Sequence, residues 1–187
     1  MPHHLSFLKS EMDSLWQSHY WYTRQVIRDA VSNSPCLNVD LDALYENQDD
    51  LGANFAKLTD NKKAGTKLTA ALKEHITIAV NIVLAAIKGE DIKKLYAQWQ
   101  VNASEIAEIY HHYNHCIKFK TMNKHMQEHL DTTLAEAVAI IEGNCAESYE
   151  TGEVALAHVR VMAAYIASKF PCNETSDSLD HHCNKCK

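Results

Sequence analysis

The sequence contains little glycine and proline, the residues that most often interrupt regular structure. Only five glycines and three prolines occur among 187 residues, and they fall mostly between long periodic segments. This distribution predicts helices joined by short turns. The strand-like alternation of apolar and polar residues is also missing. The sequence therefore favours an all-α fold over any fold that contains a sheet.

Long apolar runs and an excess of positive charge are missing too. We expect no membrane partner, because no apolar run approaches the roughly 18–20 residues of a membrane span. The net charge of −6 disfavours a nucleic-acid partner, which a basic face would normally bind. The N-terminal residues lack the charged and apolar regions of a secretory signal, so we expect a cytoplasmic protein with free thiols at Cys36, Cys116 and Cys145.

Apolar positions that recur every 3.6 residues predict six helices. The first two are expected at about residues 5–31 and 39–58. The third is expected to follow the polar break TDNKKAG and to end at residue 88. The last three are expected at about residues 91–113, 119–142 and 147–170. We predict a single six-helix bundle over residues 1–171 and a flexible tail over residues 172–187. The hydrophobic content of 46% is ordinary for such a soluble domain.

A repeat links the first helix of each expected hairpin. The segments LKEHITIAVNIVLAAIKG and MQEHLDTTLAEAVAIIEG both contain Glu-His, and both place glycine fourteen residues after the histidine, at Gly89 and Gly143. Asn33 follows His19 at the same distance, and asparagine also tolerates the left-handed conformation that ends helices. His19, His75 and His129 therefore occupy equivalent positions in the predicted repeat.

The second helices of the hairpins also correspond. Asn47 and Asp50 are three residues apart in one helix, as are Asn102 and Glu105 in another, so each pair shares a helical face. His158 takes the place of the asparagine in the last hairpin. These polar residues lie among apolar neighbours, and an unpartnered buried polar group costs about 1–3 kcal/mol. We therefore predict three pseudo-repeated hairpins with a shared polar interior.

The chain resembles an uncharacterised family of small bacterial all-helical proteins. The resemblance covers roughly residues 15–170 and rests on LWQSHYWYTR, LYENQDDLGANF, AGTKLTAALKEHITIA, WQVNASEIA, MQEHLDTTLAEAV and a final His-x3-Met-Ala before KFP. It implies a helical bundle with these histidine, asparagine and acidic positions as its signature, and it implies no particular activity. The segment from His111 to His115 and the tail depart from the family pattern.

A metal centre is the first interpretation of the polar interior. Imidazole nitrogen suits zinc, iron, copper and nickel, and bundle interiors hold such sites. The predicted metal ligands are four histidines from four different helices: His19, His75, His129 and His158. Asp50 and Glu105 are the predicted oxygen ligands. A hydrogen-bonded polar core without metal is the alternative, because the paired Glu-x-x-His motifs of di-iron bundles are missing from this register.

A pocket for a small anionic ligand is the second interpretation. Trp16, His19 and Arg24 lie within about two helical turns and offer an aromatic wall, a hydrogen-bonding group and a fixed charge. Arginine suits a carboxylate or phosphate, which it holds with two hydrogen bonds. The predicted ligand-binding residues combine these with the second helices: Trp16, Arg24, Asn47, Asp50, Asn102 and Glu105. In the alternative, Arg24 pairs with Asp50 or Glu105.

Local histidine pairs and the tail offer further donors. His125 with His129, and His111 with His115, are four residues apart on a helix and could each hold a metal ion at the surface. The tail places His181 and His182 beside a Cys-x2-Cys motif, a set that suits zinc, metal scavenging or an intermolecular disulfide. Surface histidine pairs are usually incidental.

The sequence thus predicts a metal- or small-ligand-binding bundle. The alternative is a homo-oligomeric structural or interaction protein whose buried polar network only specifies packing. An enzymatic role is left open, since no nucleophile is singled out.

Overall fold

The structure is a computed structural model that describes residues 2–171. Over this range it confirms the predicted all-α fold of six helices, and the tail expected at residues 172–187 lies outside the described residues. The helices are α1 (Pro2–Ser32), α2 (Leu37–Thr59), α3 (Lys62–Ile87), α4 (Lys93–Tyr113), α5 (Phe119–Ile141) and α6 (Cys145–Ser168).

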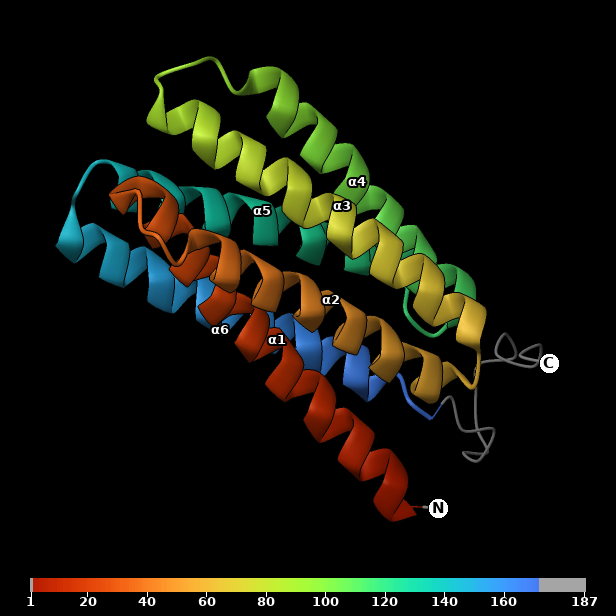
Figure 1. The fold of residues 1–187 in the computed structure, drawn as a ribbon. Helices are drawn as coiled ribbons and strands as arrows, with labels where there is room; N and C mark the ends of the chain where they lie inside the picture. The colour runs from red at the N-terminus through yellow and green to blue at the C-terminus, as the bar shows by residue number, and fades with distance from the viewer. Residues whose placement is uncertain (1, 172–187) are drawn as a thin grey trace.

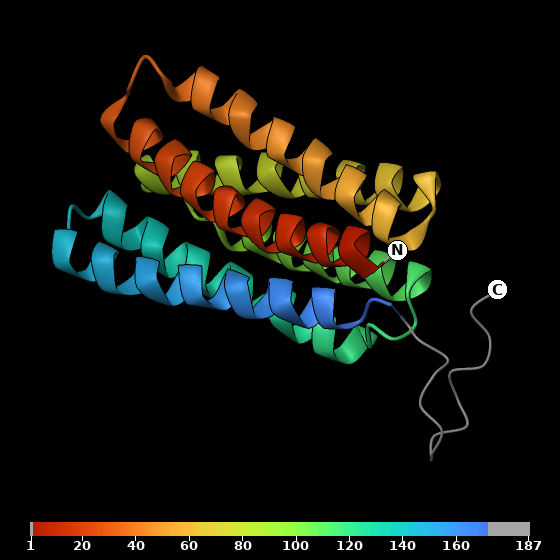
Figure 2. The ribbon, with the colours of Figure 1, turned by 90° about the horizontal axis from the view of Figure 1, so that it is seen from below.

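The six helices form a closed bundle in which each helix packs against its neighbours in sequence. α6 also packs against α1 and closes the ring, and α1, α3 and α5 contact one another inside it. Figure 1 shows that the α1–α2, α3–α4 and α5–α6 loops lie at the same end of the molecule. The view from below shows the helices running lengthwise through the bundle, with α1 between the α2–α3 side and the α5–α6 side (Figure 2). Side chains of the three odd-numbered helices therefore share the interior.

The odd-numbered helices are followed by the left-handed residues that the repeat predicts. Asn33, Gly89 and Gly143 have φ angles of 52°, 71° and 69°. Asparagine and glycine tolerate this region, because the steric penalty of a larger side chain is reduced or missing there. The predicted helix stops are confirmed at all three positions.

The third helix begins earlier than expected. The segment TDNKKAG was predicted to be a polar break, but α3 already begins at Lys62. Asn61 caps the helix, since its side chain accepts hydrogen bonds from the backbone N–H groups of Lys63 and Ala64. Position 65 of this helix requires glycine because α2 comes very close to it: a Cβ atom there would lie 2.5 Å from the carbonyl oxygen of Gly52.

The apolar core is divided along the bundle. The largest cluster includes Met12, Phe55 and Tyr110, whereas two small clusters centre on Val26 and Ile27. Along α1, His19 lies between the Met12 end and the Val26 end. The predicted polar interior is thus a layer across the bundle, with apolar packing on both sides.

Within residues 2–171, α3 alone is long and apolar enough to cross a membrane by length and composition. This is weak support for a membrane span, because the core helix of a soluble protein passes the same test. α3 packs against α2, α4, α1 and α5 in the bundle.

Candidate functional site: a histidine layer and a neighbouring histidine–glutamate cluster

Three histidines meet at the centre of the bundle. His19 on α1, His75 on α3 and His129 on α5 are only 2%, 2% and 4% exposed. The ring centroid of His129 lies 5.6 Å from that of His19 and 5.9 Å from that of His75. The indole of Trp16 packs edge-on against His19 at 5.3 Å, and that of Trp99 lies 5.0 Å from His75. The structure thus forms a continuous row of aromatic rings, which we call the histidine layer.

Hydrogen bonds fix the protonated nitrogen of two of these rings. His75 donates from Nδ1 to Oδ1 of Asn102 at 2.8 Å, so its Nε2 carries a lone pair. That Nε2 atom is buried and has no hydrogen-bond partner among residues 2–171. His19 accepts at Nδ1 from Nε2 of Gln48 at 3.2 Å, which places its proton on Nε2. Gln48 is fully buried, and sequence reasoning missed it because it lies beside the predicted Asn47 without a motif of its own.

Burial keeps the histidine layer uncharged at neutral pH. Desolvation lowers the pKa of His19 to about 3, and the neighbouring His75 lowers it as well. Desolvation likewise lowers the pKa of His75 to about 4. The pKa of His129 lies well below its ordinary value because of burial and the other histidines. The three rings are therefore neutral and aromatic under physiological conditions.

The same hydrogen bond recurs in each of the three hairpins. A side chain of the second helix donates to the backbone carbonyl four residues before the layer histidine of the first helix. The three bonds are Asn47 Nδ2 to Leu15 O (3.0 Å), Asn102 Nδ2 to Ala71 O (3.1 Å) and His158 Nε2 to His125 O (2.8 Å). The donors are the residues that the sequence repeat aligned. The pseudo-repeat itself stays a prediction, and this recurrence supports it.

The predicted set of four metal ligands does not come together as one centre. Within residues 2–171, the only group of three or more His, Cys, Asp or Glu ligand atoms lying within 4.8 Å of one another belongs to His125, Glu128 and His158. His158 therefore lies with residues of α5 outside the histidine layer. We call this group the His-Glu cluster, and all three of its residues are partly buried.

The predicted oxygen ligands do not face the interior. Asp50 and Glu105 are exposed, although Asn47 and Asn102 one turn before them are 3% and 2% exposed. Three residues advance a helix by about 300°, which leaves the acid roughly 60° away from the buried asparagine. That rotation is enough to place both carboxylates in solvent, so the prediction that they line the interior is wrong.

Arg24 is engaged by a partner that the sequence analysis did not identify. Its guanidinium forms an ion pair with the 3% exposed carboxylate of Glu136 on α5 and donates to the carbonyl of Ser148 at 3.1 Å. Tyr20 donates to the same carboxylate at 3.2 Å. Gly152 of α6 packs directly on this group, since a Cβ atom there would lie 2.6 Å from the guanidinium. Arg24 thus forms a buried ion pair with Glu136. The prediction that Arg24 pairs with Asp50 or Glu105 is wrong.

The remaining predicted donors are separated or lie elsewhere. His125 and His129 do not act as a surface pair, because His129 turns into the histidine layer. His111 lies beside His115 with ring centroids 5.2 Å apart, and its Nδ1 donates to the carbonyl of Ile117 at 2.8 Å. The cysteine-histidine tail lies outside the described residues. Cys36 and Cys145 are free as expected, whereas the expectation fails for Cys116, which is disulfide-bonded.

No family profile, curated protein or solved structure matches this chain.

Proposed function

We propose that this chain is a metal-binding protein whose site is the His-Glu cluster, formed by His125 and Glu128 of α5 with His158 of α6. The observation that carries the proposal is the convergence of two imidazoles and one carboxylate within 4.8 Å. Imidazole and carboxylate donors suit zinc and the neighbouring transition metals. Three protein ligands leave a further coordination position for water or another molecule.

The orientation of His158 supports this assignment. Its Nε2 donates to the carbonyl of His125 at 2.8 Å, so the lone pair lies on Nδ1. That Nδ1 atom is 4.0 Å from Oε2 of Glu128. Metal-bound histidines commonly donate their other ring N–H to a carbonyl or carboxylate, which fixes the ring for binding. The hydrogen bond at His158 has this form.

The distances in the cluster are compatible with a bound zinc ion. Zinc binds nitrogen and carboxylate oxygen at about 2.0–2.2 Å, so two ligands in tetrahedral geometry lie roughly 3.4 Å apart. The 4.0 Å between His158 and Glu128 requires only a small side-chain adjustment. Lys124 lies 3.5 Å from the other oxygen of Glu128, but this pair is exposed and its energy is small.

We assign the histidine layer a packing role, as in the structural alternative. The recurring carbonyl hydrogen bonds join α2 to α1, α4 to α3 and α6 to α5. Such bonds require one rotation and one register of each helix pair, since a buried donor left without its acceptor costs about 1–3 kcal/mol. These hydrogen bonds beside the layer therefore specify which faces of the helices meet.

Zinc titration of the full chain tests the proposal. The background variant carries His181→Ala, His182→Ala, Cys183→Ser and Cys186→Ser, which removes the four metal donors that the sequence predicts in the tail. Calorimetry of EDTA-treated, dialysed protein should show one zinc per chain. Glu128→Gln and His158→Ala should each weaken binding at least tenfold, because each removes one of three ligands.

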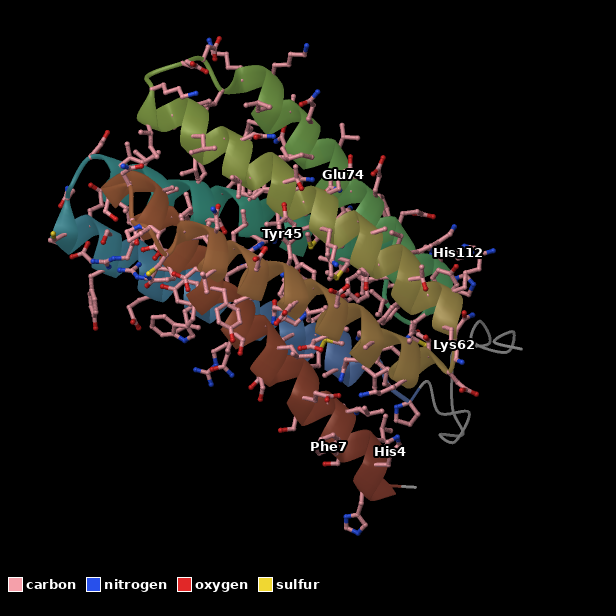
Figure 3. The ribbon with its side chains drawn as sticks, viewed as in Figure 1. His4, Phe7, Tyr45, Lys62, Glu74 and His112 are labelled. Atoms are coloured by element: carbon pink, nitrogen blue, oxygen red, sulfur yellow. The ribbon has the colours of Figure 1, made fainter. Side chains whose placement is uncertain are left out.

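Two histidine variants serve as controls. His112→Ala removes an exposed histidine of α4 that is not part of the cluster and is labelled in Figure 3. His75→Ala removes one of the three histidines of the histidine layer. Both should keep zinc binding. Stoichiometric zinc that survives His158→Ala, or that is lost only in His75→Ala, would contradict the proposal and favour a metal centre in the layer.

A further inference from the structure

A cavity lies beside the histidine layer, on the side of the loops that follow α1, α3 and α5. Its volume is about 190 Å³, and its wall is formed mainly by α1, α2, α3 and α5. Thr23 and Thr133 lie in the wall one helical turn beyond His19 and His129, and Trp99 separates it from His75. The cavity therefore extends along the bundle axis from the layer toward the loops.

The division of the core agrees with this cavity. Two small apolar clusters occupy this end of the bundle, one around Val26 and the other around Ile27. Their buried members all lie in the cavity wall: Val26, Leu44, Ile76, Ile27, Val83 and Ala137. The side chains of these two clusters thus line the same cavity.

The chemistry of the wall selects a neutral ligand. Within the described residues the wall contains aliphatic side chains, Trp99 and the uncharged polar residues Thr23, Asn38 and Thr133, but no acid or base. The cation closest in sequence to Thr23 is Arg24, which is neutralised by Glu136. An anion would therefore lose its hydration without gaining a charged partner, at a large cost.

Two polar groups of wall residues are buried and make no hydrogen bond within residues 2–171: the hydroxyl of Thr23 and the indole N–H of Trp99. Binding pockets typically combine an apolar wall with a few such groups, which orient the ligand. Asn38 and Leu84 of the wall are exposed, so the cavity reaches the surface between the start of α2 and the end of α3.

From these features we propose a second binding site, independent of the metal site, for a small neutral compound with an apolar body and at most one hydroxyl-type group. Size supports this class, because an apolar cavity of about 150 Å³ is sufficient for benzene. A monocyclic aromatic molecule fills the space, and its hydroxyl pairs with Thr23.

Calorimetric titration with benzene, phenol and benzoate tests the site in the full chain with EDTA present. Benzene and phenol should bind saturably, and benzoate should bind at least tenfold more weakly than phenol. Ala137→Leu and Ala79→Leu each fill the cavity and should weaken benzene binding at least tenfold. Thr23→Val should weaken phenol up to about tenfold while leaving benzene unchanged, as expected for one hydrogen bond.

Two controls keep the result interpretable. Ala70→Leu makes the same change at an exposed position of α3 and should not affect binding. Circular dichroism identifies any variant that fails to fold, and the cavity-filling variant that does fold decides the test. An absence of saturable binding, equal binding in a folded filled variant, or benzoate binding as tightly as phenol would each overturn the proposal.

Discussion

Acidification should destabilise this protein through its buried histidines. The pKa values of His19 and His75 are lowered to about 3 and about 4 in the folded state, whereas an unfolded chain binds these protons near pH 6.5. Between these values the unfolded state holds more protons than the folded state. The contribution of the neutral rings to stability is thus complete above pH 6.5 and is lost as the pH falls toward 4.

The size of this loss of stability follows from the pKa of histidine in the unfolded chain. At pH 5.5 each buried histidine that remains neutral lowers the free energy of unfolding by roughly 1.4 kcal/mol relative to pH 8. His19 and His75 together account for about 3 kcal/mol, a large share of the 5–15 kcal/mol typical of a domain. The lowered pKa of His129 acts in the same direction.

Urea denaturation at pH 8, 7, 6 and 5.5 in EDTA measures this dependence. His75→Gln removes one titrating group, so its loss of stability between pH 8 and pH 5.5 should be smaller than that of the wild type by about 1.4 kcal/mol. His112→Gln, at the exposed position in Figure 3, should leave the dependence unchanged. Equal pH dependence in His75→Gln and wild type would refute the assignment of a buried, neutral His75.

Two further predictions concern packing. Arg24→Met leaves the buried carboxylate of Glu136 without its cation and should lower the free energy of unfolding by about 3–5 kcal/mol. Adding Glu136→Gln to this variant should recover part of the lost stability. Equal stability of Arg24→Met and wild type in urea at pH 7.5 would contradict the ion pair. Gly65→Ala places a methyl group 2.5 Å from the carbonyl oxygen of Gly52 and should lower the free energy of unfolding by about 1–3 kcal/mol. Thr66→Ala, at the next and exposed position, should change the free energy of unfolding by no more than about 0.5 kcal/mol. Similar losses in both variants would exclude the close contact of α2 with α3.

Features that depend on nearby residues could be predicted from the sequence. The apolar period defined six helices, and the fourteen-residue distance from each histidine identified Asn33, Gly89 and Gly143 as helix stops. His75 could be placed on a buried face because it lies on the same apolar stripe of its helix as Leu68, Leu72 and Ile82. The start of α3 was missed, since Gly65 in its first turn was taken as part of a polar break and is explained only by its contact with α2.

The partners of the polar residues could not be predicted. Arg24 is five residues after His19, about 140° around α1, which turns it away from the layer and toward α6. Its partner Glu136 follows His129 by seven residues and lies on nearly the same face two turns later. The acid in the apolar run LAEAVAII was a usable signal, but only the packing of α1 against α5 and α6 shows which cation it meets.

The sequence by itself determined the helices, most of their ends and the burial of three histidines, because these depend on periodicity and on backbone preferences over a few residues. The tertiary structure alone decided that His158 leaves the layer to join His125 and Glu128, that Asp50 and Glu105 face solvent, and that a cavity adjoins the layer. Each of these depends on the rotation of a helix about its axis. That rotation is fixed by the packing of all six helices together, which no single segment of the sequence contains.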